Sequence, residues 1–292
     1  MSTRPTQPAT VTTTRTRAPK EFEDIEEFGE HPARGRFNSA FFWVMGGYIN
    51  WHMHKRKATA FADLPPTVVE LGAGVGANMR YLPVDARLIA IEPNPYMHTR
   101  LRRAARSRGV DLEIRSVVAE QIDLPDASAD AVISSLVLCS VRDPDAVLAE
   151  IRRVLRPGGR FSFAEHVAAK LGTPTRWTQR ILRRPWAWIF EGCSCERDLA
   201  RVIQSAGFSS VDLSHYRIRS PFLPFNTHIA GTAIAWAGPC LDRARLRLLG
   251  SSGVMTAPRL VPREGAALSN PVGTARAPRR PAPWVVPRAC SG

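Results

Sequence analysis

A glycine-rich turn and a later acid have the residue types and the spacing of a nucleoside-binding site in this 292-residue chain. Gly72, Gly74 and Gly76 directly follow an apolar run, and glycines let the backbone turn tightly and approach a ligand without a Cβ in the way. Glu92 lies 20 residues after Gly72, the spacing at which an acid accepts hydrogen bonds from both ribose hydroxyls. We therefore predict that this part of the chain binds an adenine nucleoside derivative.

The same turn also satisfies the pattern of a dinucleotide site, with Ala77 in the place of the third glycine. Two features favour S-adenosylmethionine over NAD. Glu70, two residues before the first glycine, can accept a hydrogen bond from a ligand ammonium, which S-adenosylmethionine has and NAD lacks. The turn also contains no Lys or Arg that would neutralise a phosphate. We predict S-adenosyl-L-methionine as the cofactor and keep NAD as a minor alternative.

A histidine and three cysteines are further candidates for chemistry. His166 ends the fifth predicted strand, where open α/β sheets bind ligands, so it is our candidate for a general base or a substrate contact; a histidine that orients a loop is the alternative. Glu165 could orient this imidazole or face solvent. Cys139 could relay the transferred group, although a small buried cysteine that packs is the commoner case. Cys193 and Cys195 are too close together for a zinc site, which needs two spaced pairs, so we predict no metal.

Short apolar runs that alternate with helical stretches must position these residues. Strands are predicted at 67–71, 87–91, 112–118, 130–138, 160–164, 211–218 and 228–236. Asn94 and Asp143 each precede a proline, which predicts helix starts there, and a helix is expected between the glycine turn and the second strand. The alternation predicts an α/β fold: a doubly wound, mostly parallel, Rossmann-like seven-stranded sheet with helices on both faces, ending in a hairpin-like pair.

Most of the net charge of the chain lies outside this predicted core. The 40 Lys and Arg against 26 Asp and Glu give +14, but the first 20 residues carry four basic residues and no acid, and the last 55 carry nine Arg and two acids. Because a nucleic-acid-binding domain carries its charge on the folded surface, this distribution argues against nucleic acid as a partner. We divide the chain into a disordered tail (1–20), a helical, aromatic cap (21–63), a cofactor-binding domain (64–237) and a disordered Arg/Pro/Gly-rich tail (238–292).

The cysteine count and the termini predict a cytoplasmic protein. Five cysteines, an odd number, occur without a secretory signal and so favour reduced thiols. The apolar stretch from Ala40 to Trp51 is shorter than the about 20 residues of a membrane-spanning helix. Residues 40–57 could at most lie on a membrane surface, as a peripheral contact.

Three strings of residues resemble a known family. The string LRPGG at 155–159 resembles the turn before the fifth strand of class I methyltransferases. The strings SLVLCSV at 135–141 and AEHV at 164–167 narrow the resemblance to the methyltransferase-like thiol S-methyltransferases of animal membranes and their bacterial relatives. The similarity runs over about 64–235. It implies transfer of a methyl group from S-adenosylmethionine to a small lipophilic acceptor, with a thiol favoured.

Two alternatives to the thiol remain at this point. A quinone- or sterol-type enzyme, which methylates oxygen or carbon, has a similar LRPGG region. A non-catalytic nucleotide-binding protein could instead use the basic tails to bind polyanions.

The resemblance also implies which residues contact the cofactor and the acceptor. The end of the third strand contacts adenine in this family, which points to Ala119 and Glu120, although Val118 stands where many members have Asp. The predicted cofactor contacts are Glu70, Gly72, Gly74, Gly76, Asn78, Glu92, Pro93, Ala119, Glu120 and Leu136. The family places substrate-covering elements after the fifth strand. An apolar lid is therefore predicted from Trp177, Trp186, Trp188 and Phe190, closed from the other side by Phe41, Phe42, Trp43 and Tyr48.

Overall fold

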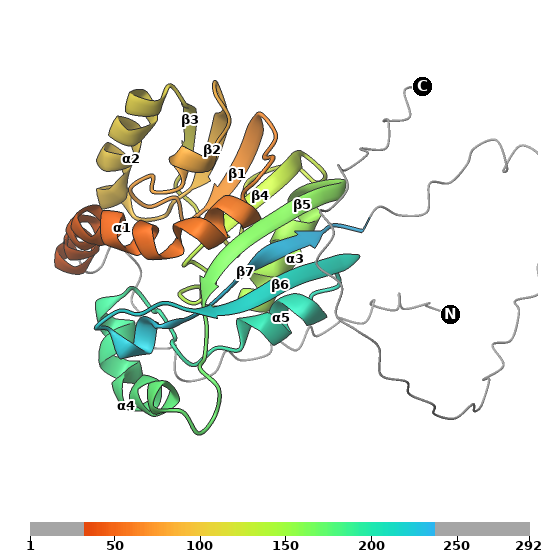
Figure 1. The fold of residues 1–292 in the computed structure, drawn as a ribbon. Coiled ribbons are helices and arrows are strands. Elements are labelled where there is room, and N and C mark those ends of the chain that lie inside the picture. The colour runs from red at the N-terminus through yellow and green to blue at the C-terminus, as the bar shows by residue number, and fades with distance from the viewer. Residues whose placement is uncertain (1–31, 237–292) are drawn as a thin grey trace, which may run out of the picture. The chain divides into compact units, whose positions relative to one another are not determined.

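Apolar runs form one seven-stranded sheet within residues 32–236, the part of the chain that the computed structural model describes. The strand order is β3-β2-β1-β4-β5-β7-β6 (Figure 1). Strands β1 to β5 pair in parallel, whereas β7 lies antiparallel between β5 and β6. The strands are β1 Thr67–Leu71, β2 Arg87–Ile91, β3 Asp111–Arg115, β4 Ala129–Ser135, β5 Leu155–His166, β6 Ser210–Arg217 and β7 Thr227–Ile234. The predicted doubly wound, mostly parallel α/β fold is confirmed.

The predicted tails fall on residues that are not described. Residues 1–31 and 237–292 lie outside the described part, and these ranges include both tails and residues 21–31 of the predicted cap. The domain bounds at 64 and 237 stay predictions.

Strand β5 begins earlier than the sequence predicts. Helix α3 (Pro144–Val154) ends directly before it, and Leu155 already pairs with Ala129 of β4. The register then shifts before Arg160 pairs with Ala131. Gly159 lies at this irregularity, where a Cβ would come within 2.8 Å of the carbonyl oxygen of Arg156. The LRPGG string therefore belongs to the strand itself and is not the turn before it that the resemblance implied.

The predicted helix starts are confirmed by their capping contacts. In α2 (Pro95–Arg108), the side chain of Asn94 accepts from the backbone N–H of Tyr96. In α3, the side chain of Asp143 accepts from two backbone N–H groups of the first turn. Gly109 ends α2 with φ +67°, a left-handed conformation that glycine adopts without strain.

Between the glycine turn and β2 the chain forms no helix of more than three residues, so the prediction of a helix there was wrong. The segment 77–86 is too short for a long helix and includes Pro83, which disfavours one. Only Met79–Tyr81 within it are helical, as the 3-10 helix η2. The long helix α1 (Pro32–Ala60) crosses this face of the sheet and takes the missing helix's place (Figure 1). The predicted break at Gly46 and Gly47 does not occur. Each glycine costs helix propensity, about 1 kcal/mol, but the helix continues through both.

Two apolar layers cover the two faces of the sheet. Met53 of α1 and Leu101 of α2 pack against Leu88 on one face. Helices α3 and α5 (Leu199–Ser205) pack on the other face, around Phe161 and Phe163 of β5. Helix α4 (Pro174–Ile189) and the 3-10 helix η3 (Leu223–Phe225) pack together beyond the carboxyl end of β5 (Figure 1). The carboxyl edge of the sheet is thus enclosed by α1, α4 and the β6–β7 connection.

Candidate cofactor and acceptor site

The glycine turn after β1 has three residues with positive φ, at +55°, +55° and +85° for Gly72, Gly74 and Gly76. A Cβ on Gly72 would lie 2.5 Å from the side chain of Val137, and one on Gly76 would lie 2.9 Å from Ala104. A Cβ on Gly74 would meet nothing closer than a backbone oxygen at 3.9 Å. Packing therefore requires glycine at the outer two positions, whereas the space beside Gly74 is open for a ligand.

Glu92, at the end of β2, is hydrogen-bonded to this turn. Its Oε2 accepts from the backbone N–H of Gly74 at 2.7 Å, and its Oε1 accepts from that of Asn94 at 2.9 Å. Burial raises the pKa of Glu92 to about 7, and these two hydrogen bonds oppose the shift. Each carboxylate oxygen keeps a second lone pair, so Glu92 can still accept from the hydroxyls of a ribose.

Glu70 is part of a buried polar chain that the sequence analysis missed. Its Oε1 accepts from Asn78 Nδ2 at 2.7 Å, and Asn78 Oδ1 in turn accepts from Lys57 Nζ at 2.9 Å. Lys57 also donates to Asn50 within α1. Burial lowers the pKa of Lys57 to about 8 and raises that of Glu70 to about 7. Asn78, predicted as a cofactor contact, thus links an acid to a buried ammonium.

The second oxygen of Glu70 makes this turn fit a cationic ligand. Glu70 Oε2 is buried and has no hydrogen-bond partner among the described residues. A buried carboxylate oxygen without a donor is costly, and a ligand ammonium would supply that donor. Together with the open space beside Gly74, this oxygen gives the residues a fit to the amino acid and nucleoside parts of S-adenosylmethionine.

Three other predicted cofactor contacts, Pro93, Ala119 and Glu120, differ in their burial and in their hydrogen bonds. Glu120 Oε1 accepts from the backbone N–H of Arg142 at 2.7 Å, so this acid holds the loop before α3. Ala119 is buried beside it in the apolar core, and Pro93 is half-buried between Glu92 and Asn94. Their assignment to adenine or ribose stays a prediction.

The loop after β4 lies between the glycine turn and an apolar cavity. Leu136 has a left-handed φ of +62°, and the next side chain, Val137, packs against Gly72. Glu165 holds this loop: it is fully buried, and its Oε2 accepts from the backbone N–H groups of Val137 and Leu138 at 2.9 and 3.1 Å. Burial raises the pKa of Glu165 to about 7. The expectations that Glu165 faces solvent or orients His166 were wrong.

An apolar cavity of about 60 Å³ lies on the other side of this loop. Its aromatic lining residues are Phe41, Phe42, Tyr48, Trp186, Phe190, Phe222 and Phe225. Leu136, Cys139, Ser140 and Cys193 also line it. The predicted meeting of aromatics from α1 with those after β5 is confirmed. Three of the predicted lid residues do not line it: Trp43, Trp177 and Trp188 are each more than 60% exposed.

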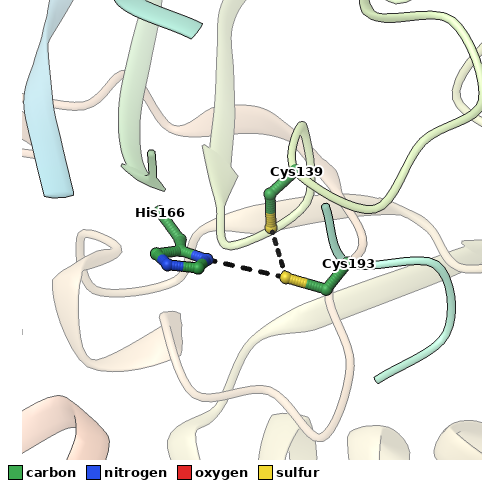
Figure 2. Close-up of side chains that lie close together, drawn as sticks. All are labelled: Cys139, His166 and Cys193. Atoms are coloured by element: carbon green, nitrogen blue, oxygen red, sulfur yellow. Dashed lines mark hydrogen bonds between the residues drawn. The ribbon is translucent and has the colours of Figure 1, made fainter. Parts of the chain in front are cut away.

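Two cysteines and His166 meet at the edge of this cavity (Figure 2). Cys193 Sγ lies 3.4 Å from Cys139 Sγ and 3.6 Å from His166 Nδ1. All three side chains are buried, and His166 has no exposed surface. His166 Nε2 lies 2.7 Å from the carbonyl oxygen of Pro224. Cys195 is also buried but is not part of the cluster, because its thiol donates to the carbonyl of Gln179 at 3.3 Å. The spacing of Cys193 and Cys195 along the chain gave no sign of this grouping, in which Cys193 pairs with residues from two other parts of the chain.

Within residues 32–236, every helix is either too short or too polar to cross a bilayer. Helix α1, the longest, buries several polar groups, among them Asn38, Asn50 and Lys57. Its exposed side chains include Trp43, at 63% exposure, and Trp51, at 74%.

Comparison with known proteins gives consistent matches. The methyltransferase domain family matches residues 69–163. Over 197 residues the chain is 34% identical to human thiol S-methyltransferase TMT1A, covering 63% of this chain and 80% of the relative. It is 38% identical to human TMT1B over 171 residues, covering 57% of this chain and 70% of that one. In fold it resembles phospholethanolamine N-methyltransferase 2 of Haemonchus contortus, with a TM-score of 0.53 at 13% identity, covering 73% of this chain and 61% of that one.

The fold, the glycine turn with its acids and these matches define the class: the protein is an S-adenosylmethionine-dependent methyltransferase. Its cofactor is S-adenosyl-L-methionine. Within the class, the chain belongs to the family of the thiol S-methyltransferases TMT1A and TMT1B.

Proposed function

We propose that this enzyme transfers the methyl group of S-adenosylmethionine to the sulfur of a small lipophilic thiol. One observation carries the proposal: the cofactor turn and the apolar cavity share the loop 136–140. Val137 packs on Gly72, while Leu136 and Cys139 line the cavity. An acceptor in the cavity is therefore separated from the cofactor turn by a single loop.

Methyl transfer from S-adenosylmethionine requires little of the protein except correct placement of the two reactants. S-adenosylmethionine supplies a methyl group that is already activated on a sulfonium. The acceptor thiol releases its proton to water, and its sulfur forms a bond to the methyl carbon as the carbon–sulfonium bond breaks, so both products are uncharged at sulfur. The chain's part is to hold the two sulfurs in line and to exclude water, which the aromatic walls contributed by α1 and α4 would do.

The cavity lining favours a thiol over an alcohol or a phenol. Among the described residues, neither a carboxylate nor an amine lines it, so an acceptor has no strong base beside it. A thiol loses its proton near pH 8.5, whereas a phenol needs about pH 10. The names of the human relatives, thiol S-methyltransferases, support the same choice.

Matched acceptor pairs test the proposal. The full chain would be incubated with S-adenosylmethionine and with thiophenol or phenol, octanethiol or octanol, and a demethylated quinol, and methylated products would be measured by mass spectrometry. We expect each thiol to be methylated at least about tenfold faster than its oxygen analogue. Turnover of the phenol or the quinol alone would overturn the assignment to sulfur.

We also propose that α1 contacts membrane surfaces, from which a lipophilic acceptor would enter the cavity. Phe37, Val44 and Trp51 are exposed on α1 at helical spacing, and the cavity residue Tyr48 lies on the same stripe. Sedimentation with phosphatidylcholine vesicles tests this: binding should fall when Trp51 and Val44 are both replaced by Ser. Equal binding by the wild type and the double variant would contradict the proposal.

A further inference from the structure

Cys139, His166 and Cys193 bring three donor atoms together from three separate parts of the chain. Cys139 follows β4, His166 ends β5 and Cys193 follows α4 (Figure 2). The two Sγ atoms and a ring nitrogen of His166 all lie within 4.8 Å of one another. Both cysteines also line the acceptor cavity. The cluster is thus a buried S₂N donor set with one side open to that cavity.

The hydrogen bond of the His166 Nε2 atom leaves the Nδ1 atom available as a metal ligand. The Pro224 carbonyl is only an acceptor, so His166 Nε2 carries the proton and donates to it at 2.7 Å. In the neutral imidazole with its proton on Nε2, Nδ1 carries the lone pair, and it faces Cys193. Gln179 Nε2 donates to the same carbonyl at 3.0 Å and fixes its position. Histidines that bind metals typically donate their other N–H to a backbone carbonyl in this way.

The distances suit one tetrahedral ion. Zinc–sulfur bonds of about 2.3 Å and zinc–nitrogen bonds of about 2.05 Å at tetrahedral angles place two sulfurs about 3.8 Å apart, and sulfur and nitrogen about 3.6 Å apart. The corresponding distances from Cys193 are 3.4 Å to the other sulfur and 3.6 Å to Nδ1. The third pair, Cys139 Sγ and the ring nitrogen of His166, lies within 4.8 Å, so these two atoms would approach by up to about an ångström when the ion binds.

We propose that Cys139, Cys193 and His166 bind one Zn²⁺ ion whose fourth position faces the cavity and takes the acceptor sulfur. Two thiolates balance the charge of the ion, and the donor set of sulfur and imidazole is one that zinc prefers over magnesium or calcium. Three protein ligands and one open position are the arrangement of catalytic zinc sites. The binding of the acceptor rests on the thiol function proposed above; the metal site itself does not.

At this ion an acceptor thiol would bind as its thiolate and release one proton to water. Its sulfur would then form the bond to the methyl carbon as the carbon–sulfonium bond breaks. The products are a thioether, a weak zinc ligand that leaves readily, and S-adenosylhomocysteine. The ion neither gains nor loses an electron, so no oxidant or reductant takes part. The cluster thereby supplies the activation that the lining of the cavity lacks.

Metal content tests the site without any turnover. The full chain, produced without a histidine tag and kept reduced, would be loaded with Zn²⁺, desalted and measured by mass spectrometry for metal per chain. We expect about one zinc per chain, and affinity at least about 10- to 100-fold lower for Cys139→Ser, Cys193→Ser and His166→Gln. Cys195→Ser is the matched control, because its thiol is buried nearby but bonds to Gln179. The double variant Cys240→Ser/Cys290→Ser excludes the two remaining thiols and should keep its zinc.

Cobalt supplies a second measurement that needs no variant. Co²⁺ bound to the wild-type chain should show a sulfur-to-cobalt charge-transfer band and the intense visible bands of tetrahedral coordination. Adding octanethiol without S-adenosylmethionine should strengthen the charge-transfer band, because a third sulfur joins the ion. An unchanged band would overturn the open position, and an octahedral spectrum would overturn the site.

The outcomes separate the metal site from the thiol function. Zinc bound through the three residues without thiol methylation would leave the site standing and remove the function. Thiol methylation at full rate by reduced, metal-free enzyme would leave the function standing and overturn the part proposed for the ion in it. A Cys139–Cys193 disulfide that forms in air, with no zinc taken up after reduction, would overturn the metal site.

Discussion

The carboxylate of Glu92 accepts a hydrogen bond from the backbone N–H of Gly74 at 2.7 Å, so the acid that ends β2 and the turn that follows β1 are directly joined. The bond spans 18 residues of sequence, and it depends on the parallel pairing of β1 and β2. Any change in the charge of Glu92 therefore acts on the turn as well as on the ribose that we predict it binds.

Replacing Gly74 with Leu should weaken S-adenosylmethionine binding about 10- to 100-fold, because the side chain would occupy the open space beside the turn. A non-glycine residue at φ +55° also costs about 1–2 kcal/mol of stability. Isothermal calorimetry measures the affinity, and urea denaturation measures the stability.

Gly109→Leu is the matched control for this loss. Gly109 has a similar φ of +67° and open space around it, but it caps α2 away from the turn. It should lose comparable stability and keep its affinity. Equal losses of affinity in the two variants would show that strain, and not occlusion, explains the Gly74 result.

S-adenosylmethionine affinity should rise with pH between 6 and 8. The pKa of Glu92 is raised to about 7, so its ionised share rises from about a tenth to about nine tenths over this window, and only the carboxylate accepts from both ribose hydroxyls. Glu70, whose pKa is also raised to about 7, ionises over the same window, so we expect an increase of at least about tenfold in the wild type. Glu92→Gln should lose most affinity at pH 8 and have a flatter profile. Wild-type affinity that is constant across this range would contradict the prediction.

Lys57→Met should change how stability depends on pH. The folded pKa of Lys57 is lowered from 10.5 to about 8, so between these values the unfolded chain binds the proton and the folded chain does not. Wild-type stability therefore gains up to about 1.4 kcal/mol per pH unit from this group as pH rises from 8 to 10.5. The gain should be absent in the variant. Urea denaturation at several pH values tests this, and parallel curves for the two proteins would refute it.

Phe190→Ala should raise KM for lipophilic thiols about tenfold or more, while the affinity for S-adenosylmethionine is unchanged. Phe190 lines the cavity and packs edge-on against Phe41 of α1, with ring centroids 5.2 Å apart, so its loss removes apolar contact to the acceptor. Trp188→Ala is the control, since Trp188 is 67% exposed and lies off the cavity. Similar KM values in both variants would place the acceptor elsewhere.

The strands and helix starts were predictable because their causes are local. Apolar runs bounded by turn residues predicted the first and last residues of β1 and β2 correctly. A capping side chain before a proline likewise predicted where α2 and α3 begin. The β5 start was not predictable in this way. A proline and two glycines are typical of a helix end, yet pairing with β4 carries residues 155–159 into the sheet.

Site residues held by long-range contacts were harder to predict. Lys57 ends a basic run, which is typical of a solvated face, but it is buried against Asn78. Cys193 contacts Cys139, which lies 54 residues earlier in the sequence, so spacing along the chain carried no information about this contact. One indication was available: Cys139 and His166 follow adjacent predicted strands, whose carboxyl ends lie at the same edge of a parallel sheet.

The place of β7 in the sheet has a consequence for synthesis of the protein on the ribosome. Strand β6 pairs with no described strand except β7, which is made after it and inserts between β5 and β6. The connection between them also carries Pro224, whose carbonyl holds the His166 ring. A nascent chain can thus fold its glycine turn early, but it cannot complete the cysteine–histidine cluster until residues up to 234 have left the exit tunnel.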